Sequence, residues 1–176
     1  AFGLGVRLAG GVLFYPADSD DSFTDDALKT FYDIWCGIPP LSRSGFAGVG
    51  ALCSTIDGRL IGTQFPAEIY DSTFSKIRWG DHVRGEKTWC VRTDILRQYP
   101  FPEEPCGHVP EGLVWGAIAR HYRTRFVNKS LRVYFSEGDS IMAMGVRLRG
   151  IRRNAHGLFL WLQDMLHNDL KWIRLS

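Results

Sequence analysis

The residues best suited to chemistry are three aspartates in the run Asp18-Ser19-Asp20-Asp21, which directly follows the apolar stretch 11–17. Carboxylate oxygens are the ligands that hard divalent cations such as Mg²⁺ and Mn²⁺ prefer. Neighbouring carboxylates repel one another and lose hydration when buried, so we expect a positive charge to compensate them. A metal ion bound by Asp18, Asp20 and Asp21 would do so. The alternative is a solvated loop whose acidic residues favour the start of the following helix.

Another carboxylate stands at the start of a predicted helix. Pro110-Glu111 opens the segment 109–122, whose apolar residues recur with helical spacing. The helix dipole favours the ionised carboxylate and lowers the pKa of Glu111, whereas partial closure from water would raise it. Helix-terminus electrostatics alone would also explain an acidic residue here. His108, just upstream, either forms a hydrogen bond within its loop or contacts a ligand.

Basic residues gather in the segment 120–153, which has nine lysines or arginines. Because guanidinium offers a bidentate fork to phosphate, four of them are candidates for binding a diphosphate: Arg147, Arg149, Arg152 and Arg153. The plain alternative is two solvated strand faces and a flexible segment, and a third interpretation is contact with an anionic membrane surface. Aromatic residues do not interleave with these charges, so we expect no nucleic-acid partner.

Hydrophobic spacing and turn signals predict the elements that position these residues in the first half of the chain. The apolar run 11–17 predicts a buried strand, and 27–35 predicts a helix with Ser22 or Thr24 as its N-cap. Asp57-Gly58 between two apolar runs predicts a hairpin turn. Residues 66–87 read as a long polar loop, a length typical of functional or mobile segments.

In the second half, residues 88–92 predict a strand and Thr93 the start of a short helix. Residues 124–128 and 131–135 predict two short strands, and 157–173 a helix with an apolar face. Strands alternate with helices, so the predicted class is α/β with a mixed central sheet flanked by helices. The 176 residues, 45% hydrophobic with a net charge of +2, predict a single soluble domain.

Four segments, in this order, resemble family-2 glycosyltransferases of the GT-A fold. They are the apolar strand with DSDD and the helix containing FYDIW, then GEKTWCVRTDILRQYPFPEE (85–104), HVPEGLVWGAIARHYRTRFVNKSLRVYF (108–135) and RRNAHGLFLWLQDMLHNDLKW (152–172). DSDD alone is a weak signal, but the ordered set covers most of residues 11–173 and is fairly specific.

The resemblance implies an inverting, metal-dependent glycosyltransferase that uses a nucleotide-diphosphate sugar, here a UDP- or dTDP-sugar. The family's Asp-x-Asp signature falls on Asp18-Ser19-Asp20, the adjacent Asp21 could replace either as ligand, and the metal is Mn²⁺ or Mg²⁺. In such enzymes the metal assists departure of the nucleoside diphosphate as a Lewis acid.

The resemblance also implies a general base, which takes the proton of the acceptor hydroxyl. Glu111 occupies the family's acidic position, and Glu103 and Glu104 are the alternatives. Trp79 and His108 are the predicted acceptor contacts, Trp79 because aromatic rings stack on sugar faces. The expected acceptor is a saccharide or a lipid-linked sugar, as in the synthesis of a surface polysaccharide.

The same resemblance divides the chain into the end of the donor- and metal-binding half (1–21), an acceptor-side half (22–135) and a C-terminal basic segment with a helix (136–176). A nucleoside-binding part is expected to precede residue 1. The expected location is the cytoplasm, with peripheral contact at the inner face of the membrane as an alternative. A non-catalytic α/β interaction domain derived from a glycosyltransferase is the alternative function.

Overall fold

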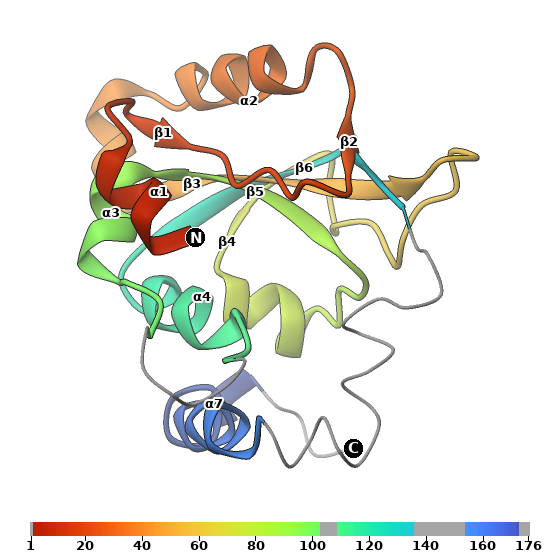
Figure 1. The fold of residues 1–176 in the computed structure, drawn as a ribbon. Helices are drawn as coiled ribbons and strands as arrows, with labels where there is room; N and C mark the ends of the chain where they lie inside the picture. Colours follow the sequence, from red (N-terminus) through yellow and green to blue (C-terminus); the bar gives the residue numbers. More distant parts are fainter. Residues whose placement is uncertain (1, 103–108, 136–153, 173–176) are drawn as a thin grey trace.

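The computed structural model describes residues 2–102, 109–135 and 154–172, which form an α/β fold with helices on both faces of a mixed sheet (Figure 1). The predicted class is therefore confirmed. The helices are α1 (Phe2–Leu8), α2 (Ala27–Cys36), α3 (Thr93–Gln98), α4 (Gly112–Ala119) and α7 (Ala155–Asn168), with the short turns η1 (Pro40–Gly45), η2 (Lys76–Gly80) and η3 (Leu170–Trp172). The strands are β1 (Leu13–Phe14), β2 (Ser22–Phe23), β3 (Phe46–Thr55), β4 (Ile69–Ser72), β5 (Lys87–Arg92) and β6 (Arg123–Tyr134).

The sheet has the strand order β1-β5-β3-β6-β2, and β4 also pairs with β6. The central pair β3 and β6 is parallel, and every other pair is antiparallel. Two short strands share the outer edge of β6: β4 pairs with its first half, from Thr124 to Val127, and β2 with Arg132 and Val133. This arrangement brings the loop that precedes β2 beside the end of β6.

Strand β3 is buried along almost its whole length, as expected of a central strand covered on both faces. Two glycines let its neighbours approach. A Cβ at Gly48 would lie 2.1 Å from the carbonyl oxygen of Cys90 on β5, and one at Gly50 would lie 2.7 Å from the ring of Phe126 on β6. Both positions therefore exclude a side chain.

Each face of the sheet has its own apolar core. Helix α2 covers one face and buries Ala27, Thr30, Phe31 and Trp35, which share one side of the helix. Its core also contains Ile38, Phe46, Val49, Ala51, Cys90, Val127 and Leu131. The opposite face is packed by α1, α3 and α4 through Val6, Ala47, Val91, Ile95, Leu96, Val114, Trp115 and Ile118.

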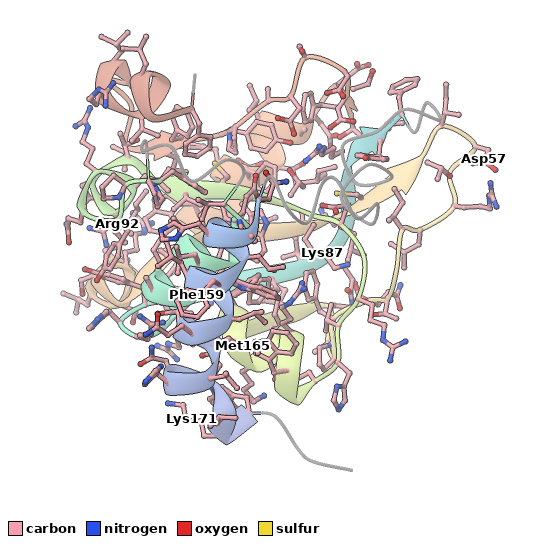
Figure 2. The ribbon with its side chains drawn as sticks, turned by 60° about the horizontal axis from the view of Figure 1, so that its bottom comes forward. Asp57, Lys87, Arg92, Phe159, Met165 and Lys171 are labelled. Carbon is pink, nitrogen blue, oxygen red and sulfur yellow. The ribbon has the colours of Figure 1, made fainter. Side chains whose placement is uncertain are left out.

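Helix α7 packs against α4 on the side away from the sheet (Figures 1 and 2). Arg120, at the end of α4, forms an ion pair with Asp164, and a Cβ at Gly112 would lie 2.7 Å from the indole nitrogen of Trp161. The apolar face predicted for this helix is only partly covered, since Phe159, Leu162 and Leu166 stay exposed. In the described residues no helix is both long enough and apolar enough to span a bilayer.

Several local predictions are confirmed. Residues 55–59 form the predicted turn, in which Gly58 has a φ of +79° and its N–H donates to the carbonyl of Thr55. The expected second arm of this hairpin pairs only through the isolated bridge between Ser54 and Leu60. Strand β5 and helix α3 lie where the sequence predicts them.

Other local predictions are wrong. Ser22 lies in β2, not at an N-cap, and α2 begins after Asp26 without a side-chain cap. The supposed irregular segment 66–87 contains β4 and η2. The two short strands predicted at 124–128 and 131–135 are one strand, β6, of 12 residues. Sequence signals failed here because pairing with β3 and β4, more than local spacing, keeps β6 extended.

Candidate active site

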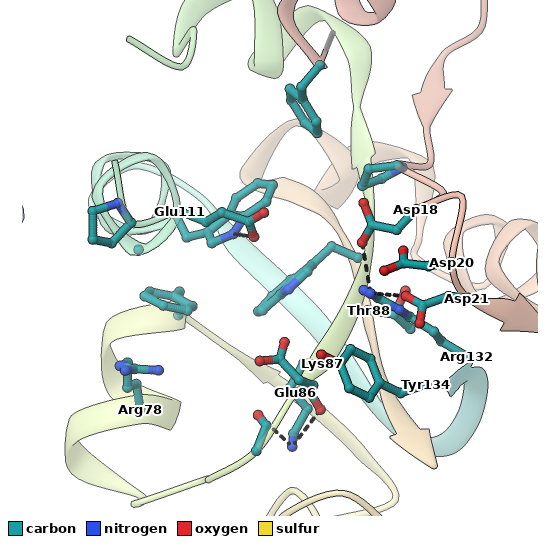
Figure 3. A pocket seen from close by; sticks show the side chains of 18 of the residues that line it. Asp18, Asp20, Asp21, Arg78, Glu86, Lys87, Thr88, Glu111, Arg132 and Tyr134 are labelled. Atoms are coloured by element: carbon teal, nitrogen blue, oxygen red, sulfur yellow. Dashed lines mark hydrogen bonds and ion pairs between the residues drawn. The ribbon is translucent and has the colours of Figure 1, made fainter. Parts of the chain in front are cut away.

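A cavity of about 1060 Å³ opens between the loop before β2, the start of β5, η2, the N-terminus of α4 and α7 (Figure 3). Its lining combines charged and aromatic side chains drawn from distant parts of the chain. The charged ones are Asp18, Asp20, Asp21, Arg78, Glu86, Lys87, Glu111 and Arg132, and the aromatic ones are Phe2, Phe74, Trp89, Trp115, Tyr134, Phe135 and Trp161.

The charge of the aspartate run is partly offset by Arg132, which comes from β6 and lies 114 positions away from Asp18 in the sequence. Arg132 Nη2 donates to Asp18 Oδ2 at 2.8 Å and also forms an ion pair with Asp21. The side chain of Asp21 is 1% exposed, and that of Arg132 is 13% exposed. Burial by itself lowers the pKa of Arg132, but the Asp21 carboxylate outweighs it, and the net pKa is raised. The expected compensating charge is therefore confirmed, and a protein side chain supplies it.

Two of the three predicted metal ligands remain accessible. Asp18 and Asp20 are exposed at the cavity rim, whereas Asp21 is buried against Arg132. The described residues do not gather three histidine, cysteine or acidic side chains in an arrangement that could hold a metal ion. Mg²⁺ is usually bound by one or two carboxylates, with waters and substrate phosphates completing its shell. Asp18 and Asp20 suit that mode, and the metal role of all three aspartates stays a prediction.

Glu111 occupies the N-cap position of α4, and its carboxylate lies at the cavity wall, where Trp115 Nε1 donates to Oε2 at 3.3 Å. Desolvation raises the pKa of Glu111, the Trp115 hydrogen bond opposes this, and the charges of Asp18 and Glu86 add to the rise. Glu111 as a whole is nevertheless exposed, so its carboxylate is close to other protein atoms and still reached by water. The net pKa shift of Glu111 is thus the rise expected from partial closure from water, not the fall expected from the helix terminus.

Beside these groups, Lys87 begins β5 and Glu86 directly precedes it. The Lys87 side chain is buried, and its Nζ donates to three backbone carbonyls, the shortest bond being 2.7 Å to Arg84. Burial lowers the pKa of Lys87. Its charge is thus used to hold the preceding loop, while the carboxylate of Glu86 faces the cavity (Figure 3).

Aromatic rings form the wall around α4 and η2. Trp89 and Trp115 stack with ring centroids 5.6 Å apart, and Trp161 of α7 lies over Gly112. The guanidinium of Arg78 lies 5.0 Å from the ring centroid of Trp79 and 6.0 Å from that of Trp161. This wall is therefore apolar, with one cation held among its rings.

The cavity brings together some of the predicted site residues but not all. Asp18, Asp20, Asp21 and Glu111 line it. Trp79 is not among the lining residues, although its ring centroid is 6.3 Å from that of Trp161, which is. The other predicted site residues lie outside the described residues: Glu103, Glu104, His108, Arg147, Arg149, Arg152 and Arg153.

Sequence reasoning missed Arg78, Glu86, Arg132 and Trp161. Arg132 was one of nine basic residues and had no distinguishing neighbour. Its role follows from the pairing of β6 with β2, which no local pattern reveals. Arg78 and Glu86 lay in the segment taken for an irregular loop. A weak signal for Glu86 was its place two residues before a predicted strand.

Comparisons with protein-family models, with curated proteins and with solved structures found no match to this chain.

Proposed function

We propose that this protein is an inverting, metal-dependent glycosyltransferase that moves a sugar from a nucleotide-diphosphate sugar to an acceptor hydroxyl. The observation that carries the proposal is that the aspartate run and Glu111, far apart in the sequence, line one cavity. A cation-binding carboxylate pair and a separate carboxylate base are the two devices that such a transfer needs. The mixed sheet with helices on both faces is compatible with the C-terminal portion of a GT-A fold.

Asp18 and Asp20 are the residues that would hold Mn²⁺ or Mg²⁺, with the donor diphosphate as the remaining ligand. The bound metal would neutralise charge on the departing nucleoside diphosphate. Arg132 holds Asp18 by a hydrogen bond, and Asp20 also lines the cavity. The predicted UDP- or dTDP-sugar donor and a saccharide or lipid-linked acceptor in polysaccharide synthesis belong to the same proposal.

Glu111 is the proposed general base. The acceptor oxygen forms a bond to the anomeric carbon, and its proton passes to the Glu111 carboxylate. The electron pair of the broken glycosyl–oxygen bond leaves with the nucleoside diphosphate. Because the acceptor oxygen enters from the face opposite to this leaving group, the configuration inverts. A carboxylate whose pKa is raised by its surroundings is a better proton acceptor than one stabilised by a helix terminus alone.

Calorimetric titration with UDP, in the presence and absence of Mn²⁺, tests the donor site. We expect binding that depends on Mn²⁺ and is lost in Asp20→Asn, since that change removes one ligand charge and keeps the shape. Asp33→Asn is the matched control, because Asp33 lies on the exposed side of α2, where it pairs with Lys29.

If Asp20→Asn and the unmodified protein bound UDP and Mn²⁺ equally well, the aspartate run would be only a solvated loop. Absence of Mn²⁺-dependent binding in the unmodified protein would favour the non-catalytic interaction domain.

A further inference from the structure

Arg78 is unlike the other cavity cations because no acidic group in the described part of the chain pairs with it. Arg132 pairs with two aspartates, and Lys87 donates to three carbonyls. Among the described residues the side chain of Arg78 has no hydrogen bond or ion pair, and its guanidinium lies near the rings of Phe74, Trp79 and Trp161. Its five N–H donors are thus without a protein acceptor in the described part of the chain.

The surroundings of Arg78 make an uncompensated cation costly. Protein packed around the guanidinium lowers its pKa, and Glu86 opposes this only at a distance. The residue as a whole is exposed, so a ligand can reach it. Rings that lie against a guanidinium fix its orientation and leave its donors free for a planar oxyanion. This is a preorganised site for a carboxylate or a phosphate group.

The position of Arg78 separates this site from the proposed donor site. Arg78 comes from η2, while Asp18 and Asp20 come from the loop before β2 and lie on another side of the cavity (Figure 3). Glu86 and Glu111 also line the cavity and repel a second anion elsewhere in it. An anionic group other than the donor diphosphate is therefore best accommodated beside Arg78.

We propose that Arg78 binds an oxyanion of the acceptor, a carboxylate or a phosphate, so that the acceptor is an acidic saccharide or a phosphate-bearing sugar. The identification of the bound molecule as the acceptor rests on the proposed transferase function, but the binding of an anion by Arg78 does not. Trp161, beside Arg78 and over the start of α4, offers an apolar face for the sugar ring next to Glu111.

Titrations followed by tryptophan fluorescence test this site, with glucuronate, a hexose phosphate and a neutral methyl glucoside as probes. We expect the unmodified protein to bind an acidic probe at least about tenfold more tightly than the neutral one, since a charge-assisted hydrogen bond contributes about that factor. Arg78→Gln should abolish the preference. Arg84→Gln is the matched control, because Arg84 belongs to the same segment and does not line the cavity.

Preference for glucuronate would identify a carboxylate-bearing acceptor, and preference for the hexose phosphate a phosphate-bearing one. The proposal is overturned if the unmodified protein shows no preference for acidic probes, or if Arg78→Gln retains it. Asp20→Asn should keep the preference, so loss of the donor site and loss of this anion site are separate results.

Discussion

At the scale of the residue, Glu111 shows how function and stability oppose each other. Its carboxylate is placed among protein atoms and near Asp18 and Glu86, and each of these raises its pKa. A carboxylate with a pKa higher in the folded than in the unfolded state binds more protons when folded. Its contribution to the free energy of unfolding is therefore most favourable at low pH and declines as the pH rises through that window.

Replacing Glu111 by Gln should lower the transfer rate by about 10²–10⁴-fold, the usual contribution of a general base. The melting temperature at neutral pH should be unchanged or higher, because Gln removes a charge that the folded state disfavours. Transfer to an acceptor, or donor hydrolysis with water as acceptor, measures the first effect, and thermal unfolding measures the second.

The matched control is Glu68→Gln, since Glu68 is exposed and does not line the cavity. In the unmodified enzyme the rate should fall as the pH decreases through the raised pKa of Glu111, because the base becomes protonated. A Glu111→Gln variant with normal turnover would exclude Glu111 as the general base and direct attention to Glu86, Glu103 and Glu104.

At the scale of the element, strand β3 fixes the geometry around which the cavity is built. It pairs with β5 on one side and β6 on the other. These two strands supply part of the cavity lining, namely Lys87, Thr88, Trp89, Arg132 and Tyr134. The spacing of β3 and β5 depends on Gly48, whose Cα hydrogen faces the backbone of Cys90 and Val91. A side chain there would push the two strands apart.

Gly48→Ala should therefore destabilise the fold by about 3 kcal/mol, the upper part of the range for overpacking, because the contacted atoms are backbone and cannot turn away. Urea unfolding measures the change. Gly45→Ala is the control, since an added Cβ at Gly45 would meet nothing within 4 Å. Similar unfolding midpoints for the two variants would mean that β5 shifts without cost and that Gly48 does not set the strand spacing.

At the scale of the whole molecule, Arg132 joins strand β6 to the loop before β2, which is distant in the sequence. Through it, the aspartate run is held against β6 by a buried ion pair with Asp21 and a hydrogen bond to Asp18. Such a pair is costly to desolvate, so its presence is not by itself a gain in stability. Removing one partner is different, since the other charge then remains buried without compensation.

Arg132→Met should lower the free energy of unfolding by about 3–5 kcal/mol, because Asp21 would be left buried and charged. Arg59→Met, which breaks an exposed pair with Asp57, should cost at most about 1 kcal/mol. Adding Asp21→Asn to Arg132→Met should restore part of the loss. Equal effects of the two single changes in chemical unfolding would show that Asp21 is hydrated and that Arg132 contributes no more than a surface residue.

The sequence by itself determined the α/β class, the turn at Asp57-Gly58, the strand β5 and the placing of acidic residues after an apolar run and at a helix start. These depend on side-chain spacing and turn chemistry within about ten neighbouring residues, which a linear pattern records. Only the tertiary structure decided that β6 is one strand parallel to β3, that Arg132 pairs with Asp18 and Asp21, and that Arg78, Glu86 and Trp161 meet Glu111 at one cavity. Contacts such as Arg132 with Asp18, 114 positions apart, arise from strand pairing across the sheet, and spacing along the chain carries no trace of them.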